Sequence, residues 1–143
     1  MIITKETDYA LRILRVLLDG EKHSVAEMSE TELIPTQFAY QILRKLSAGN
    51  LVQVSRGALG GCALSCDLDA TSLYDLMGVM GERGVLCACM EPGYECRWQD
   101  EHGRCAIHYQ LAALQRKQDE AFRAVSLRRL LTGGSDPQDT SEL

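Results

Sequence analysis

The chain has 143 residues, of which 45% are apolar, and a formal net charge of −5. That length allows one well-packed domain or two small units that share a core. No stretch approaches the roughly 18 apolar residues of a membrane span, and the first residues lack the apolar core and cleavage site of a secretion signal. We therefore expect a cytoplasmic protein without a membrane partner, whose 6 cysteines serve metal binding, redox chemistry or burial rather than structural disulfides.

Three helices are predicted in the first 48 residues. Apolar residues at helical spacing, with Gly20 placed to end the run, predict the first helix: Ala10, Ile13, Leu14, Leu17 and Leu18. Ser24 and Glu27 form a capping box that opens a second helix through about residue 29. Pro35 suits the first turn of a third helix, whose inner face is Ala39, Ile42, Leu43 and Leu46. The tight break between the last two helices is typical of a helix-turn-helix.

The outer face of the third helix carries side chains that can read nucleic acid: Thr36, Gln37, Tyr40, Gln41 and Arg44. Gln and Arg pair with base edges, whereas Tyr and Thr contact phosphates or thymine methyl groups. From this helix alone, an ordinary solvated face is an equal alternative. Residues 51–54 and 62–64 then predict a β-hairpin with Arg56 and Gly57 in a glycine-rich tip, and we interpret this hairpin as a wing. Acidic residues are in excess only after residue 60, so the net charge does not exclude a nucleic-acid partner.

The second part of the chain predicts two more helices. Residues 72–80 form a short one, and an apolar seam predicts a long one after residue 105: Ile107, Leu111, Leu114, Gln118, Ala121 and Val125. Such a seam suits packing against the same helix of a second subunit, with packing on the first helix as the alternative. We expect a winged helix-turn-helix domain (1–66), a linking helix (67–86), a cysteine-rich loop (87–105), a dimerisation helix (106–131) and a disordered tail (132–143).

The cysteine-rich loop is the candidate sensor. Its donors have the spacing C-x-C-x6-C-x8-C-x2-H: Cys87, Cys89, Cys96, Cys105 and His108. Thiolates and an imidazole in a turn-rich loop are what a soft metal or an iron–sulfur cluster needs. A structural zinc site is one alternative, but such sites usually contain close C-x2-4-C pairs, and the spacings between the later cysteines here are longer. A redox sensor that uses bare thiols without metal is the other alternative. No base or orienting residue accompanies any thiol, so we expect no enzyme. Cys62 and Cys66 are expected to be small buried or surface thiols, with a redox pair as the alternative.

Taken together, these segments resemble the Rrf2 family of winged-helix regulators, which includes the IscR and NsrR groups. The resemblance covers roughly residues 1–131, and its carrying segments are residues 4–12, 34–46 and 54–61 and the loop with Cys89, Cys96 and Cys105. It implies a mainly α fold with a two-stranded wing. It also implies a homodimer that binds double-stranded operator DNA, as a repressor, and holds a 2Fe-2S or 4Fe-4S cluster in the loop.

The resemblance also implies which side chains would hold that cluster. Cys89, Cys96 and Cys105 match the three cluster cysteines of the family. His108 resembles the fourth ligand of the IscR group, whereas Asp8 resembles an aspartate of the NsrR group that reaches across the dimer. Cys87 is an additional thiol that departs from the family pattern and can substitute as a ligand. The choice between these fourth ligands stays open at this point.

Overall fold

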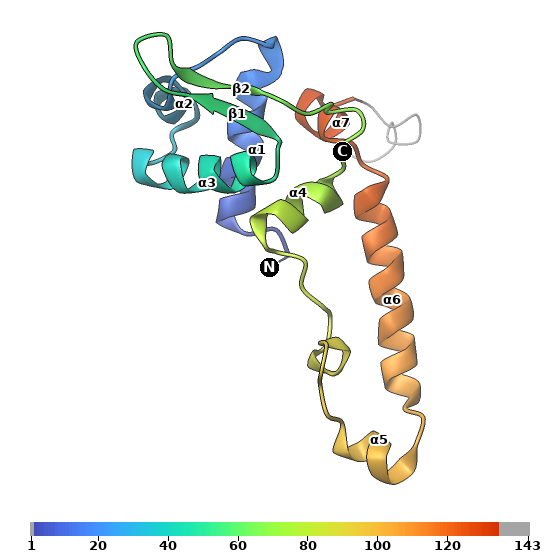
Figure 1. Ribbon diagram of the computed structural model, residues 1–143. Coiled ribbons are helices and arrows are strands. Elements are labelled where there is room, and N and C mark those ends of the chain that lie inside the picture. Colours follow the sequence, from blue (N-terminus) through green and yellow to red (C-terminus); the bar gives the residue numbers. More distant parts are fainter. Residues whose placement is uncertain (1, 135–143) are drawn as a thin grey trace.

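The computed structural model describes residues 2–134 and has two parts (Figure 1). The first part, called the body, contains α1 (Lys5–Val16), α2 (Val25–Glu32), α3 (Thr36–Ala48), the hairpin β1 (Val52–Ser55) and β2 (Gly61–Leu64), α4 (Leu73–Met80) and α7 (Leu127–Thr132). The second part, called the arm, is residues 81–123 and contains α5 (Arg97–His102) and α6 (Ala106–Arg123). The arm projects from one end of the body, so its tip lies far from the hairpin.

Helix α1 forms the centre of the body. Thr4 caps its start by accepting a hydrogen bond from the backbone N–H of Glu6. Its inner face is fully buried and consists of Ala10, Ile13, Leu14 and, in the 3-10 turn η1 (Leu17–Asp19) that follows, Leu17. Gly20 then adopts a left-handed conformation with φ of 79°, which ends the helical run. The prediction of this helix and of its stop is confirmed.

Helices α2 and α3 form the predicted helix-turn-helix. The capping box of Ser24 and Glu27 is present. Helix α2 continues to Glu32, three residues beyond the predicted end, until Leu33 turns left-handed with φ of 54°. The inner face of α3 is buried as predicted, through Ala39, Ile42, Leu43 and Leu46. Both α2 and α3 pack on α1 and on each other, so burial fixes which face of α3 remains outside.

The hairpin is an antiparallel pair that pairs Val52 with Leu64 and Ser55 with Gly61. It is held to the body by two backbone hydrogen bonds between Cys62 and His23, of 2.8 and 3.0 Å. The Cys62 side chain is fully buried in the core, and this burial raises the pKa of its thiol to about 11. The wing is therefore fixed to the connection between α1 and α2, beside α3.

The long helix predicted after residue 105 is interrupted, which corrects the sequence interpretation. Helix α6 ends at Arg123, and α7 begins after Ser126, which caps it by accepting from the N–H of Arg129. Two backbone hydrogen bonds join the break to the start of α4, from Leu73 N–H to Val125 O (2.9 Å) and from Leu127 N–H to Thr71 O (2.8 Å). Because Leu127 is fully buried in the core, tertiary packing ends the seam at this position.

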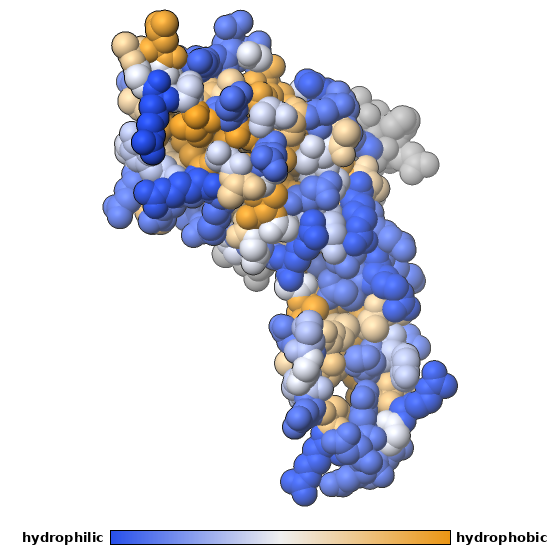
Figure 2. Space-filling view, in the orientation of Figure 1, coloured by the Kyte–Doolittle hydropathy of each residue, from blue (hydrophilic) through white to orange (hydrophobic). Residues whose placement is uncertain are grey.

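The arm lacks a closed core of its own. Helix α6 packs on α4 and on the 3-10 turn η2 (Ala88–Met90), and it contains no buried residue. Ile107 and Leu114 of the predicted seam are 71% and 53% exposed, and apolar side chains show among hydrophilic ones on the arm in Figure 2. The alternative expectation is that the long helix packs on the first helix. This packing is seen for α7, which contacts α1. Within residues 2–134, no helix combines the length and apolarity that crossing a membrane would require.

Candidate functional site

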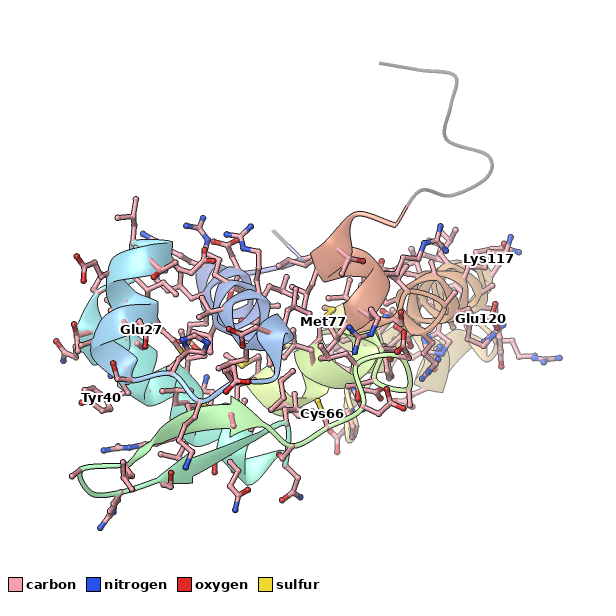
Figure 3. All side chains as sticks on the ribbon, turned by 90° about the horizontal axis from the view of Figure 1, so that it is seen from above. Glu27, Tyr40, Cys66, Met77, Lys117 and Glu120 are labelled. Atoms are coloured by element: carbon pink, nitrogen blue, oxygen red, sulfur yellow. The ribbon has the colours of Figure 1, made fainter. Side chains whose placement is uncertain are left out.

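A groove separates α3 from the wing. It has a volume of about 710 Å³ and is lined by the start of α2, by Tyr40 and Arg44 of α3 and by Arg56 and Gly57 of the hairpin tip. Figure 3 shows Tyr40 at the edge of the body, on the same side as the wing. Four of the residues predicted to bind nucleic acid therefore line one groove, although they come from two separate elements.

The other predicted contact residues lie along the exposed side of α3. Thr36, Gln37 and Gln41 are exposed, and none of them lines the groove. Helix α3 contains no acidic residue, so its outer side carries positive charge and uncharged polar groups but no negative charge. Ser47 also lines the groove, and the sequence reasoning missed it. The spacing of Tyr40, Arg44 and Ser47, at i, i+4 and i+7, was the available signal.

The hairpin tip has a defined turn geometry. Gly57 has φ of 103°, and its carbonyl accepts from the N–H of Gly60 at 2.9 Å. A Cβ on Gly60 would lie 2.5 Å from the backbone oxygen of Ser55, so a side chain does not fit there. The Lys22 ammonium donates to the carbonyl of Leu59 at 3.4 Å. These contacts fix the tip beside the groove and leave Arg56 exposed.

Cys89 contacts two other predicted donors where the cysteine-rich loop lies against α6. The sulfur of Cys89 lies 3.4 Å from the sulfur of Cys87 and 3.4 Å from Nδ1 of His108. A hydrogen bond from the backbone N–H of Cys89 has the largest effect on the pKa of Cys87 and lowers it. A second hydrogen bond, from the Cys89 thiol, lowers this pKa further. The pKa of Cys89 is raised, first by its hydrogen bond with Cys87 and then by desolvation and by negative charge on Cys87, Cys96 and Cys105.

Cys96 and Cys105 belong to the same neighbourhood. Each precedes a helix, Cys96 at the start of α5 and Cys105 at the start of α6. Four thiols of the loop and the imidazole of His108, in the first turn of α6, therefore share this part of the arm, and such donors fit an iron–sulfur cluster. In the described part of the chain, no three His, Cys, Asp or Glu side chains stand close enough together to enclose a metal ion. The types of donor thus fit an iron–sulfur cluster, although among these described residues only Cys87, Cys89 and His108 are joined by close contacts.

The remaining candidate residues lie elsewhere. Asp8 is on α1 in the body, where it pairs with Arg12 at 2.9 Å, and within one chain it does not meet the arm cysteines. In the arm, Trp98 of α5 is 51% exposed and stacks on His102 with ring centroids 4.7 Å apart. Cys66, whose pKa is raised by burial, sits in the body next to the core.

Comparison with known proteins gives a match over almost the whole described chain. The sequence model of the family described as Rrf2, iron-dependent transcriptional regulator, matches residues 3–133. The protein aau3 of Rhizobium meliloti strain 1021 is 31% identical over 106 residues, which span 72% of this chain and 69% of that protein.

Solved structures share the fold. CymR, the global cysteine regulator of B. subtilis, has a TM-score of 0.69 at 21% identity, with 93% of this chain and 98% of that chain covered. IscR of T. potens has a TM-score of 0.67 at 15% identity, with 98% and 93% covered. The helices and the wing of the present chain are thus arranged as in these regulators.

Proposed function

The chain belongs to the Rrf2 family of transcriptional regulators, and on that premise we propose that it is a cytoplasmic, homodimeric repressor whose operator binding is switched by an iron–sulfur cluster in the arm loop. Members of this family are DNA-binding regulators and not enzymes, so its activity is binding rather than catalysis. The finer parts of the proposal concern the residues that contact DNA, the dimer interface and the switch.

The groove between α3 and the wing supports DNA docking through α3. In this arrangement Gln37, Gln41 and Arg44 face base edges in the major groove, because their side chains are exposed on one side of α3. Thr36 and Tyr40 then contact phosphates, and Arg56 with Gly57 at the wing tip reaches the backbone or the minor groove. The main support for DNA docking is that Tyr40, Arg44 and Arg56 line the same groove.

The exposed seam of α6 supports dimerisation. Ile107 and Leu114 lie on a helix that has no buried residue within one chain. A second α6 packed along this seam would remove these apolar side chains from water, which favours association. Two DNA-reading units held by a paired arm would then meet two operator half-sites at one fixed separation.

The arm loop supports sensing. Cys89, Cys96 and Cys105 would hold the cluster, with His108 as the fourth ligand because its Nδ1 lies 3.4 Å from the sulfur of Cys89. Cys87, at 3.4 Å from Cys89, and Asp8 from a second subunit are the rival fourth ligands. When bound, the group supplies redox-active and nitric oxide-reactive iron, and the loop residues supply its ligands and limit its access to solvent.

Selection of a duplex from a random-sequence library tests DNA docking. Arg56→Ala should weaken binding to the selected duplex and to unrelated duplexes alike, and should reduce the salt dependence of the affinity by about one charge. Gln41→Ala should instead relax the preference at particular base pairs, by about 1–3 kcal/mol per position. Wild-type affinity and selectivity in both variants would contradict this docking.

An absorption spectrum of anaerobically purified protein tests the sensor. Visible bands identify iron and sulfide, whereas a colourless protein that contains metal identifies zinc. Serine at Cys89, Cys96 or Cys105 should abolish the bands and change affinity for the selected duplex in one common direction. Serine at Cys62 or Cys66 is the matched control and should do neither. Loss of nitrogen ligation in His108→Ala, or of oxygen ligation in Asp8→Ala, identifies the fourth ligand by an altered spectrum.

A bare-thiol redox sensor is the second candidate, and one specific contact favours it. The Cys87 and Cys89 sulfurs lie 3.4 Å apart, and the lowered pKa of Cys87 favours the reactive thiolate. A protein purified anaerobically without metal, whose affinity for the selected duplex changes after mild peroxide treatment, would support this alternative over a cluster.

A further inference from the structure

We propose that Glu82 is a positioning residue that couples the arm to the DNA-reading body, so that the state of the cysteine loop reaches α3. This inference rests on the proposed switch. It names the contact through which the switch acts, and that contact lies outside both the cysteine loop and the DNA-binding groove.

Glu82 joins the first residues of the arm to the start of α1. Its carboxylate accepts hydrogen bonds from the hydroxyls of Thr4 and Thr7, and the Thr4 N–H lies 3.4 Å from the same group. The Thr7 side chain is fully buried, so this carboxylate satisfies a hydroxyl that water does not reach. A negative charge at the N-terminus of α1 is also favoured by the helix dipole.

The backbone around Glu82 fixes its position relative to α4. Gly81 adopts φ of 79° at the C-terminus of α4, and the Glu82 N–H donates to the carbonyl of Met77 at 2.8 Å. This is the hydrogen-bond pattern of a helix ended by a left-handed glycine. Glu82 therefore moves with the end of α4.

The same end of α4 is attached to α3. The Lys45 ammonium, on α3, donates to the carbonyl of Met80 at 3.3 Å and pairs with Glu6 of α1 at 2.5 Å. Val79 of α4 lies against Gly49, where a Cβ would come within 2.5 Å of the valine side chain. The position of the α4 end is thus linked to α1 through Glu82 and to α3 through Lys45 and Gly49.

A second attachment holds the arm just before the cysteines. The N–H of Leu86 donates to the side-chain oxygen of Gln115 on α6 at 2.7 Å, and Cys87 is the next residue. Only residues 83–85 separate this attachment from Glu82. A displacement of the loop at Cys87 therefore acts on a short segment that is fixed at both ends. Because residues 83–85 are too few to absorb the displacement, it is passed on to Glu82 and from there to the N-terminus of α1 and to α3.

The test compares affinities for the library-selected duplex, measured anaerobically, in two states of the protein. One state is reconstituted with ferrous iron and sulfide, and the other is stripped by a chelator. For the wild type we expect the two affinities to differ by about 5- to 150-fold. In Glu82→Ala this ratio should fall towards one while the visible spectrum is retained, and Glu82→Gln, which keeps an acceptor oxygen, should restore part of it.

Thr7→Val removes the buried one of the two hydroxyl contacts to Glu82 and serves if Glu82→Ala does not fold. Glu30→Ala, which removes an exposed carboxylate of α2, is the matched control and should keep the wild-type ratio. Trp98 is the single tryptophan of the chain and lies in the arm, so its fluorescence provides a readout in the stripped protein. Because coupling is reciprocal, the selected duplex should change iodide quenching of Trp98 in the wild type and not in Glu82→Ala.

The outcomes separate this inference from the proposed function. A wild type whose two states bind the duplex equally would overturn the switch itself, and this inference with it. A wild type that switches, together with folded Glu82→Ala and Thr7→Val variants that keep the full ratio and the Trp98 response, would overturn the role of Glu82 alone.

Discussion

Leu14 and Ile13 in the body are fully buried, whereas α6, the main helix of the arm, has no buried residue at all. The body therefore contains the apolar contacts that a stable fold needs within one chain, and the arm does not. Among the thiols, Cys62 is enclosed in the core, whereas Cys87 and Cys89 of the arm are partly exposed. The difference indicates that the body specifies its own structure, and that the arm has few stabilising contacts of its own within one chain.

The largest effect should come from the body core. Leu14→Ala removes a fully buried side chain and should lower the free energy of unfolding by about 2–5 kcal/mol, because it loses apolar burial and leaves a cavity. Leu59→Ala, at a wing-tip position that is 90% exposed, is the control and should change it by less than about 0.5 kcal/mol. Denaturant unfolding measures both, and equal effects would break the distinction between core and surface.

A substitution in the arm should change the assembly of the dimer and not the folding of the body. Leu114→Glu places a charge on the exposed apolar seam of α6 and should convert dimers to monomers, with an effect of a few kcal/mol on association. Light scattering measures the mass, and the thermal midpoint of the body in the monomer reports its folding. Glu120→Lys, at an exposed position on the side of the same helix away from the seam and labelled in Figure 3, should stay dimeric. A dimeric Leu114→Glu protein would place the interface elsewhere.

Thiol reactivity sharpens the comparison further. In metal-free protein at pH 8, iodoacetamide should alkylate Cys87 first, because the N–H and thiol of Cys89 lower its pKa. Cys62 should react slowest, by about a hundredfold or more, because burial encloses it and raises its pKa to about 11. Peptide mass spectrometry over time gives the rates. In denatured protein the two rates should converge, and equal rates in folded protein would contradict the assignment.

The smallest effect concerns the attachment of the wing to the body. His23 lies 2.7 Å from Asp19 and 3.2 Å from Glu27, and its pKa is raised above 6.5, mainly by the hydrogen bond to Asp19. A raised pKa means that the folded state binds this proton more tightly. The stabilisation is therefore complete below pH 6.5 and is lost as the pH rises through the folded-state pKa. Thermal midpoints between pH 5.5 and 8.5 should fall more in the wild type than in His23→Gln, and parallel profiles would exclude this contribution.

The sequence predicted the body well because its signals are local. The apolar spacing of α1 and the capping box of Ser24 and Glu27 each act within one or two turns, and the structure contains both. The end of α6 at Arg123 was not predictable in this way. It depends on the burial of Leu127 against a core assembled from distant segments, and on hydrogen bonds to residues more than 50 positions away.

The candidate site shows the same contrast. The outer face of α3 followed from helical periodicity, so Tyr40 and Arg44 could be named, although their shared groove with Arg56 required the packing of the wing. The spacing of the cysteines indicated donors without saying which of them meet. The approach of Cys89 to His108, 19 positions apart, depends on how η2 lies against α6. Glu82 had no sequence signal, because its threonine partners are 75 and 78 positions away.

The hydrogen bonds that join Leu73 to Val125 and Thr71 to Leu127 bring the chain back beside the start of α4, the helix from whose other end the arm leaves. Topologically, the arm is an excursion of the chain whose two ends are both held by the body. Residues added or removed between the cysteines change the reach of the arm and leave the point of return unchanged. We therefore expect that intervals shorter or longer than the six and eight residues between the later cysteines leave the packing of the body unchanged.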